Sequence, residues 1–230
     1  MAALTPKAVA AYRDERLKQV KPATVICELA FLSAIINHAR REWDINITNP
    51  VALIRKPAIP QGRDRVLAPE EETRLLAGPV PVGRINVWLL LATILSLETG
   101  MPRGELIELR WSNVDLAAQT AHLPMTTNGT ARTVSLSEKA VSRLAALPRS
   151  SDGRVIPVKG LTSHAALRKA GVRARITDFR WHDLRHTTIT RMAQKPPNVI
   201  ELAAVSGHRS WAMLKRYYHP SVTDLARELG

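Results

Sequence analysis

Basic, imidazole and phenol side chains are concentrated in residues 178–219, at spacings that could support chemistry on an anion. His182 and Arg185 lie three residues apart, so on a helix the two side chains share one face. A Gly-His pair ending at His208 follows, and Tyr217 comes nine residues later. An arginine fork can hold the oxygens of an anion, histidines can hydrogen-bond or move protons, and a tyrosine can act as a nucleophile. Together these groups suit cleavage of a phosphodiester without a metal.

The same stretch also carries the pattern of a metal site. His182 and His186 lie four residues apart with Asp183 between them, which resembles the H-E-x-x-H helix of zinc hydrolases. The internal acid is aspartate rather than glutamate, the sequence places no third ligand, and Arg185 would repel a cation. A metal-dependent hydrolase is therefore the weaker hypothesis, and we expect neither a metal nor another cofactor.

The composition favours a partner with many negative charges. Over 230 residues the formal net charge is +13 and the isoelectric point is about 10.7, the balance expected of a protein that binds a polyanion such as nucleic acid. A protein that is merely basic and soluble would show the same balance, so the motifs must decide between the two.

The sequence also indicates a compartment. Cys27 is the single cysteine and cannot form an internal disulfide, which fits a reducing environment. The longest apolar run, residues 87–97, is too short to span a bilayer, and no secretory signal is visible at the start. We therefore expect an intracellular, cytoplasmic protein that does not associate with a membrane.

Helical periodicity and proline-rich breaks divide the chain into three parts. Residues 1–58 contain two expected helices, over 5–20 and 22–42, which are few for an independent domain. Residues 59–67 read as a linker, and residues 68–230 read as the larger domain, which carries the candidate site residues.

The larger domain is expected to be mainly α with a small antiparallel β element, an α+β fold. Residues 85–98 are apolar nearly all round, as expected of a helix at the centre of a domain. Residues 119–136 read as a β-hairpin with Asn128-Gly129 as its turn. A helix capped by Ser137 and a short strand at 154–157 should follow. Further helices are expected near 161–171, 181–194, 197–206, 210–217 and 221–229.

Several motifs together resemble the tyrosine recombinase (phage integrase) family. They are T-G-M-P-R-G-E-L at 99–106, L-R-W-S-N-V-D-L at 109–116, the H-x-x-R pair, the G-H pair and the tyrosine at 217. The resemblance covers roughly residues 65–230. It implies the catalytic-domain fold of that family, preceded by an all-helical core-binding domain, of which residues 1–58 look like the later part.

The resemblance also implies roles for the site residues. Tyr217 would attack the scissile phosphate of DNA, form a 3′-phosphotyrosine and release a 5′-hydroxyl, and Tyr218 is the alternative nucleophile. Arg185 would hold a non-bridging oxygen, while His182 and His208 would hydrogen-bond the same phosphate or move protons.

Two positions depart from the family's pattern. The family places its first catalytic arginine two residues after the glycine of T-G-x-R, where this chain has Pro102, with Arg103 next as a possible substitute. The lysine expected before the hairpin turn corresponds to Thr127. Losing one such charged contact costs about 10²–10³ in rate, so two losses predict a recombinase impaired in cleavage. The alternative is a pseudo-recombinase that only binds DNA. Glu105 matches the family's acidic position and should orient the local structure.

Further contacts with double-stranded DNA are expected from basic residues outside these motifs. The candidates are Arg132, Arg180, Arg191, Lys215 and Arg216, and about half of such residues would instead be ordinary solvated charges. Family members act as tetramers on paired sites, so the resemblance implies a homo-oligomer on DNA. It also implies a bacterial or phage-encoded protein associated with the nucleoid.

Overall fold

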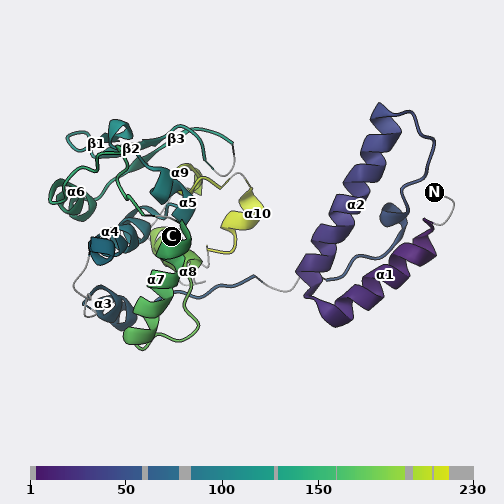
Figure 1. Ribbon diagram of the computed structural model, residues 1–230, viewed down its shortest axis with the longest axis horizontal. Helices are drawn as coiled ribbons and strands as arrows, with labels where there is room; N and C mark the ends of the chain where they lie inside the picture. The colour runs from purple at the N-terminus through teal and green to yellow at the C-terminus, as the bar shows by residue number, and fades with distance from the viewer. Residues whose placement is uncertain are drawn as a thin grey trace, which may run out of the picture. The chain divides into compact units, whose positions relative to one another are not determined.

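The computed structural model describes residues 4–58, 62–77, 84–126, 129–158, 160–194, 199–208 and 210–217. The chain forms two compact units, Met1–Arg63 and Asp64–Gly230, and each is described here by itself (Figure 1).

The first unit is built from two helices and a short 3-10 segment. α1 spans Pro6–Gln19, α2 spans Pro22–Glu42, and η1 spans Pro50–Leu53. The side chain of Thr5 accepts a hydrogen bond from the backbone N–H of Ala8, so Thr5 is the N-cap of α1 as predicted. A small core joins the three elements through Val9, Val25, Leu29, Ile36 and Val51.

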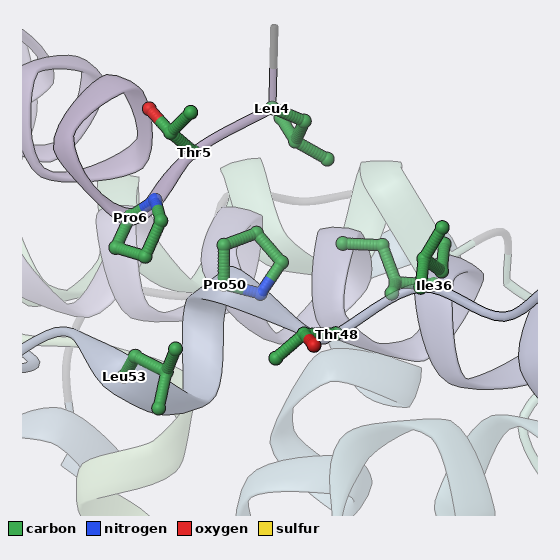
Figure 2. A pocket seen from close by; sticks show the side chains of 8 residues that line it. Leu4, Thr5, Pro6, Ile36, Thr48, Pro50 and Leu53 are labelled. Atoms are coloured by element: carbon green, nitrogen blue, oxygen red, sulfur yellow. The ribbon is translucent and has the colours of Figure 1, made fainter. Parts of the chain in front are cut away.

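Much of the apolar surface of this unit is exposed. Phe31 is 72% exposed and Ile35 is 48% exposed on α2. By length and a mean hydropathy of 1.4, α2 would be long and apolar enough to cross a membrane, a feature that the sequence search for apolar runs missed. A groove of about 270 Å³ also opens in this unit (Figure 2). Its lining is Leu4, Thr5, Pro6, Ile36, Ile47, Thr48, Pro50 and Leu53.

The second unit is organised around α4, Arg84–Thr99, as predicted from its all-round apolar sequence. α4 contacts α3 (Pro69–Ala77), α5 (Arg103–Glu108), α6 (Glu138–Ala145), α7 (Gly160–Arg173) and α8 (Trp181–Gln194). Its buried polar groups have partners. The Thr93 hydroxyl donates to the carbonyl of Leu89, and the Ser96 hydroxyl accepts from the Trp181 indole at 3.0 Å. A central helix can therefore carry polar residues without leaving them unsatisfied.

The β element is a three-stranded antiparallel sheet in the order β1-β2-β3 (Figure 1). β2 (Thr120–Leu123) and β3 (Arg132–Ser135) form the predicted hairpin, with Ala121 opposite Val134 and both side chains buried. Gly129 has φ +74°, as the turn requires, whereas Asn128 lies outside the described residues. β1 (Val114–Asp115) was not predicted, because two residues are too few to show alternation.

The remaining elements correct two predictions. The strand expected at 154–157 is wrong, because this segment forms only an isolated bridge from Arg154 to Arg110. η2 spans Trp111–Asn113 and α9 spans Val199–Ser206. The helix expected over 210–217 is shorter: α10 spans Trp211–Leu214, and a turn continues to Tyr217, whose backbone N–H donates to the carbonyl of Leu214. The helix expected over 221–229 lies outside the described residues.

The segment that enters the second unit is attached to α8. Leu67 is 1% exposed and belongs to the main core, and its backbone N–H donates to the Thr187 hydroxyl at 2.9 Å. Arg65 pairs with Glu71 at 2.8 Å. The residues from Asp64 onward, which the sequence placed in a linker, therefore pack with the larger unit.

Candidate active site

Helix α8 is the scaffold of the site. Trp181, Leu184 and Ile189 are buried and fix the helix against the core, as predicted. The carboxylate of Asp183 accepts from the backbone N–H of Arg180 at 2.8 Å, which closes the first turn. With the helix held this way, His182 is exposed while Arg185 is buried.

Arg185 joins two turns that are distant in sequence. Its Nη1 donates to the carbonyl of Gly100 at the end of α4, and its Nη2 donates to the carbonyl of Ser206 at the end of α9, at 2.6 Å. Burial lowers the pKa of the guanidinium, whereas the nearby phenol of Tyr217 raises it. The predicted phosphate ligand thus also holds the site together, because each of its two terminal nitrogens anchors a backbone carbonyl.

Tyr217 lies against two imidazole rings. Its ring centroid is 4.7 Å from that of His186 and 5.4 Å from that of His208, and the residue is 6% exposed. Burial raises the pKa of the phenol, while the charges of Arg185 and Arg216 oppose that rise. The phenol is therefore protonated at neutral pH, and it needs a base or an added charge before it can attack a phosphorus atom.

The histidines of the site are neutral in this state. Burial, followed by the charges of Arg185, His182, Arg132 and Arg216, lowers the pKa of His208 to about 4. The pKa of His182 is also lowered, first by desolvation and then by Arg185. His208 Nδ1 lies 2.9 Å from the Ser206 hydroxyl. Neutral imidazoles among guanidinium groups leave a net positive field, which an anion would complement.

Arg132 and Glu105 form a two-pronged ion pair beside this cluster. Arg132 Nη1 and Nη2 donate to the two carboxylate oxygens of Glu105 at 3.1 and 2.6 Å, and the Glu105 side chain is only 3% exposed. The pair links β3 to α5, and the guanidinium lies against Gly207. Arg132 was predicted as a DNA contact, but here its charge is engaged within the protein. Glu105 orients local structure, as its position suggested.

Of the two positions that depart from the family's pattern, the structure describes only Pro102. Pro102 is the N-cap of α5, with φ −58° and ψ 149°, and its carbonyl accepts from the N–H of Leu106 at 3.2 Å. Arg103 is the first residue of α5 and is partly exposed. Proline therefore fits this helix start but supplies no charge. Thr127 lies outside the described residues.

The other predicted DNA contacts divide into two groups. Lys215 and Arg216 are exposed in the turn that leads to Tyr217, and the Arg180 side chain is 61% exposed, with Asp178 at 3.6 Å. Arg191, by contrast, pairs with Glu72 of α3. The structure thus brings Lys215 and Arg216 next to the site, while Arg191 is committed to another helix.

The sequence did not reveal that His186 lies against Tyr217. His186 is 4% exposed and contacts Tyr217. The sequence suggested it only as a metal ligand with His182. Across the described part of the chain, no three His, Cys, Asp or Glu side chains gather as a metal site would require. Its position one turn after His182 was the available signal, but helical spacing cannot reveal a contact with a residue 31 positions later.

Residues 65–223 match the phage integrase family. The chain is 42% identical to a shufflon-specific DNA recombinase of Escherichia coli, over 98% of this chain and 60% of that protein. It is 33% identical to a putative integrase/recombinase of Haemophilus influenzae, over 93% of this chain and 60% of that protein. The chain thus spans about three fifths of the length of these two curated relatives.

Solved structures agree at the level of the fold. The Tn1549 transposon integrase in complex with circular intermediate DNA superposes with a TM-score of 0.77 at 17% identity, covering 99% of this chain and 85% of that one. A lambda integrase dimer bound to a COC′ core site gives a TM-score of 0.74 at 20% identity, covering 94% and 80%. The mainly helical fold with a small antiparallel sheet is therefore the fold of integrase catalytic domains, and the chain belongs to the phage integrase family of tyrosine recombinases.

Proposed function

We propose that this chain is the DNA-cleaving part of a site-specific recombinase, with Tyr217 as its nucleophile. The observation that carries the proposal is the cluster formed by the first half of α8 and the turn after α9, where the phenol of Tyr217 adjoins His208 and the guanidinium of Arg185. A formal net charge of +13 suits a DNA partner.

The proposed reaction forms one ester as it breaks another. The Tyr217 oxygen attacks the phosphorus, the bond to the 5′-oxygen breaks, and the DNA 3′ end remains as a phosphotyrosine. The phenol proton goes to a neutral imidazole, for which His182 and His208 are the candidates, and the leaving oxygen must gain a proton. Arg185 stabilises the charge on a non-bridging oxygen through N–H groups beyond the two that bind carbonyls. Attack by a 5′-hydroxyl reverses these steps and joins the strands.

Cleavage by this chain is expected to be impaired at two positions. Pro102 replaces a guanidinium that would share the charge of the phosphate, and Thr127 replaces an ammonium group that would protonate the leaving oxygen. Each missing contact corresponds to about 10²–10³ in rate. The same observation favours a second candidate function, a pseudo-recombinase that binds DNA without cutting it.

The relatives suggest how the protein would assemble. The solved neighbours include a lambda integrase dimer on a core site and a lambda integrase tetramer bound to a Holliday junction. We extend this arrangement to the present chain and propose that it binds double-stranded DNA as a homo-oligomer, in the cytoplasm, on the DNA of a bacterium or phage.

Covalent trapping tests the proposal directly. Nicked duplexes with randomised core sequences, which lose the attacking 5′ fragment after cleavage, would be incubated with the unaltered chain and with Pro102→Arg, Thr127→Lys and the double variant. We expect the double variant to accumulate adduct faster than the unaltered chain, with little change in DNA affinity. Tyr217→Phe in the same background should abolish the adduct, and Tyr218→Phe should not.

The remaining outcomes separate the alternatives. Adduct that forms equally fast in the unaltered chain would refute the assignment of the two departures, and Arg103→Ala would then show whether Arg103 holds the phosphate. DNA binding without adduct in any variant would favour the pseudo-recombinase. Cutting that requires an added divalent metal would support the His182–His186 hydrolase.

A further inference from the structure

His186 occupies a different position from the other two histidines of the site. His182 is exposed and His208 is partly exposed, so a DNA phosphate can reach both. His186 is 4% exposed and lies in the middle of α8, next to Arg185. The neighbours of His186 include Tyr217 and the segment at Asp64, so His186 can act on the reaction through them.

One neighbour is Tyr217. The two ring centroids are 4.7 Å apart with an interplanar angle of 50°, a tilted contact in the range where aromatic pairs are favourable. Tyr217 also belongs to a small apolar cluster with Ile189, Ala193, Leu202 and Leu214. The contact with His186 joins the ring of Tyr217 to the buried face of α8.

The other neighbour is the segment that enters the larger unit. Burial and the charges of His182 and Arg216 lower the pKa of the His186 ring, while the backbone and the carboxylate of Asp64 raise it, so Asp64 lies near the ring. A backbone group that favours the protonated ring is an acceptor, hence the carbonyl of Asp64. The backbone N–H of Leu67 donates to the hydroxyl of Thr187, the residue after His186, so this segment lies along the same part of α8.

We propose that His186 is a positioning residue for Tyr217: its ring holds the phenol against α8 while its N–H is tied to the entering segment at Asp64. The inference rests on the proposed function, in which Tyr217 is the nucleophile. A neutral ring with one donor and one apolar face can serve both contacts at once, which neither an aliphatic nor a charged side chain could do.

Cleavage kinetics test the role in the reaction. In the Pro102→Arg, Thr127→Lys background, His186→Ala should lower the single-turnover adduct rate at saturating DNA, on the order of 10²-fold for a displaced nucleophile. The DNA concentration for half saturation should not change. His186→Phe keeps a ring but not the N–H, so an intermediate rate is expected. His122→Ala, an exposed histidine on β2, is the matched control and should change nothing.

A second measurement does not depend on cleavage. In a Tyr218→Phe background, nitration of Tyr217 by tetranitromethane reports the exposure of its ring. Tyr217 should be nitrated slowly in the otherwise unaltered chain and several-fold faster in His186→Ala, whereas nitration of the exposed Tyr12 should not change.

The two readouts distinguish failure of the inference from failure of the proposed function. Equal nitration of Tyr217 with and without His186 would overturn the inference, and so would an unchanged adduct rate in His186→Ala. An adduct rate fully retained in His186→Phe would overturn the tie to Asp64. If the repaired chain with His186 intact forms no adduct, the proposed function fails, and nitration alone still decides whether His186 holds the Tyr217 ring.

Discussion

The guanidinium of Arg132 lies directly against the backbone of Gly207. A Cβ atom added to Gly207 would be 2.8 Å from Arg132 Nη1 and 3.1 Å from its Cζ. Gly207 also has φ +71°, a conformation that side chains other than glycine rarely adopt. Arg132 of β3 therefore packs against the turn that precedes His208, and the side chain of Glu105 holds the Arg132 guanidinium in place through two hydrogen bonds.

We predict that Gly207→Ala lowers the free energy of unfolding more than Gly129→Ala does. The positive φ alone costs on the order of 1 kcal/mol for a residue with a Cβ, and displacing the Arg132 guanidinium adds to that cost. Gly129→Ala is the matched control, because Gly129 has φ +74° but no described residue lies within 4 Å of an added Cβ. Urea unfolding of both variants would measure the difference, and equal losses would show that contact with Arg132 is unimportant.

We predict that Glu105→Gln is costly and Glu108→Gln is not, although both residues belong to α5. Removing the charge of Glu105 leaves Arg132 without its counter-ion in a site where its side chain is 12% exposed, and breaking a buried pair costs about 3–5 kcal/mol. Glu108 is 68% exposed and lies 3.7 Å from Arg154, a surface pair worth about 0–1 kcal/mol. Thermal and urea unfolding would test this. Similar losses in the two variants would contradict a structural role for the Arg132–Glu105 pair.

We predict that Arg185→Lys destabilises the fold even without DNA. An ammonium group cannot span the carbonyls of Gly100 and Ser206, and each hydrogen bond to a charged donor contributes about 1.5–3 kcal/mol. The free energy of unfolding should fall by about 2–4 kcal/mol. Arg180→Lys, at a side chain 61% exposed, should leave stability unchanged. A stable Arg185→Lys protein would confine the residue's role to the phosphate.

We predict that the protein loses stability as the pH falls from about 6.5 towards 4. The pKa of His208 is lowered from 6.5 to about 4, so between these values the unfolded chain binds a proton that the folded chain excludes. Stability therefore rises with pH across this window and is fully present above it. Urea unfolding at several pH values would show the slope, and His208→Gln should reduce it. An unchanged slope in His208→Gln would mean that other groups cause the acid sensitivity.

We predict salt-dependent binding to duplex DNA, with unequal contributions from the basic residues. Each neutralised phosphate contributes close to one unit to the slope of log affinity against log salt. Lys215→Gln and Arg216→Gln, at exposed positions beside Tyr217, should each reduce the slope by about one unit. Arg191→Gln should reduce it less, because Arg191 is paired with Glu72. Affinity that does not vary between low and moderate salt would refute the electrostatic basis of DNA binding.

The sequence by itself determined the features that depend on local pattern. The all-round apolar helix at 85–98, the amphipathic pattern around Trp181, Leu184 and Ile189, and the hairpin were readable because side-chain periodicity reports burial on one element at a time. The spacing of His182, Arg185, His208 and Tyr217 likewise pointed to one site.

Only the tertiary structure decided how those residues are supported. The bonds from Arg185 to Gly100 and Ser206, and the contact of His186 with Tyr217, join residues separated by 85, 21 and 31 positions. Helical and strand periodicity relates residues only a few positions apart, so it cannot predict contacts at these sequence separations. The sequence analysis counted Arg132 among the DNA contacts because a basic residue in a sequence does not reveal which group it pairs with. The ion pair with Glu105 becomes apparent only when β3 and α5 pack together. Local periodicity fixes which face of an element is buried, whereas the burial of a charge depends on which opposite charge the fold brings to it.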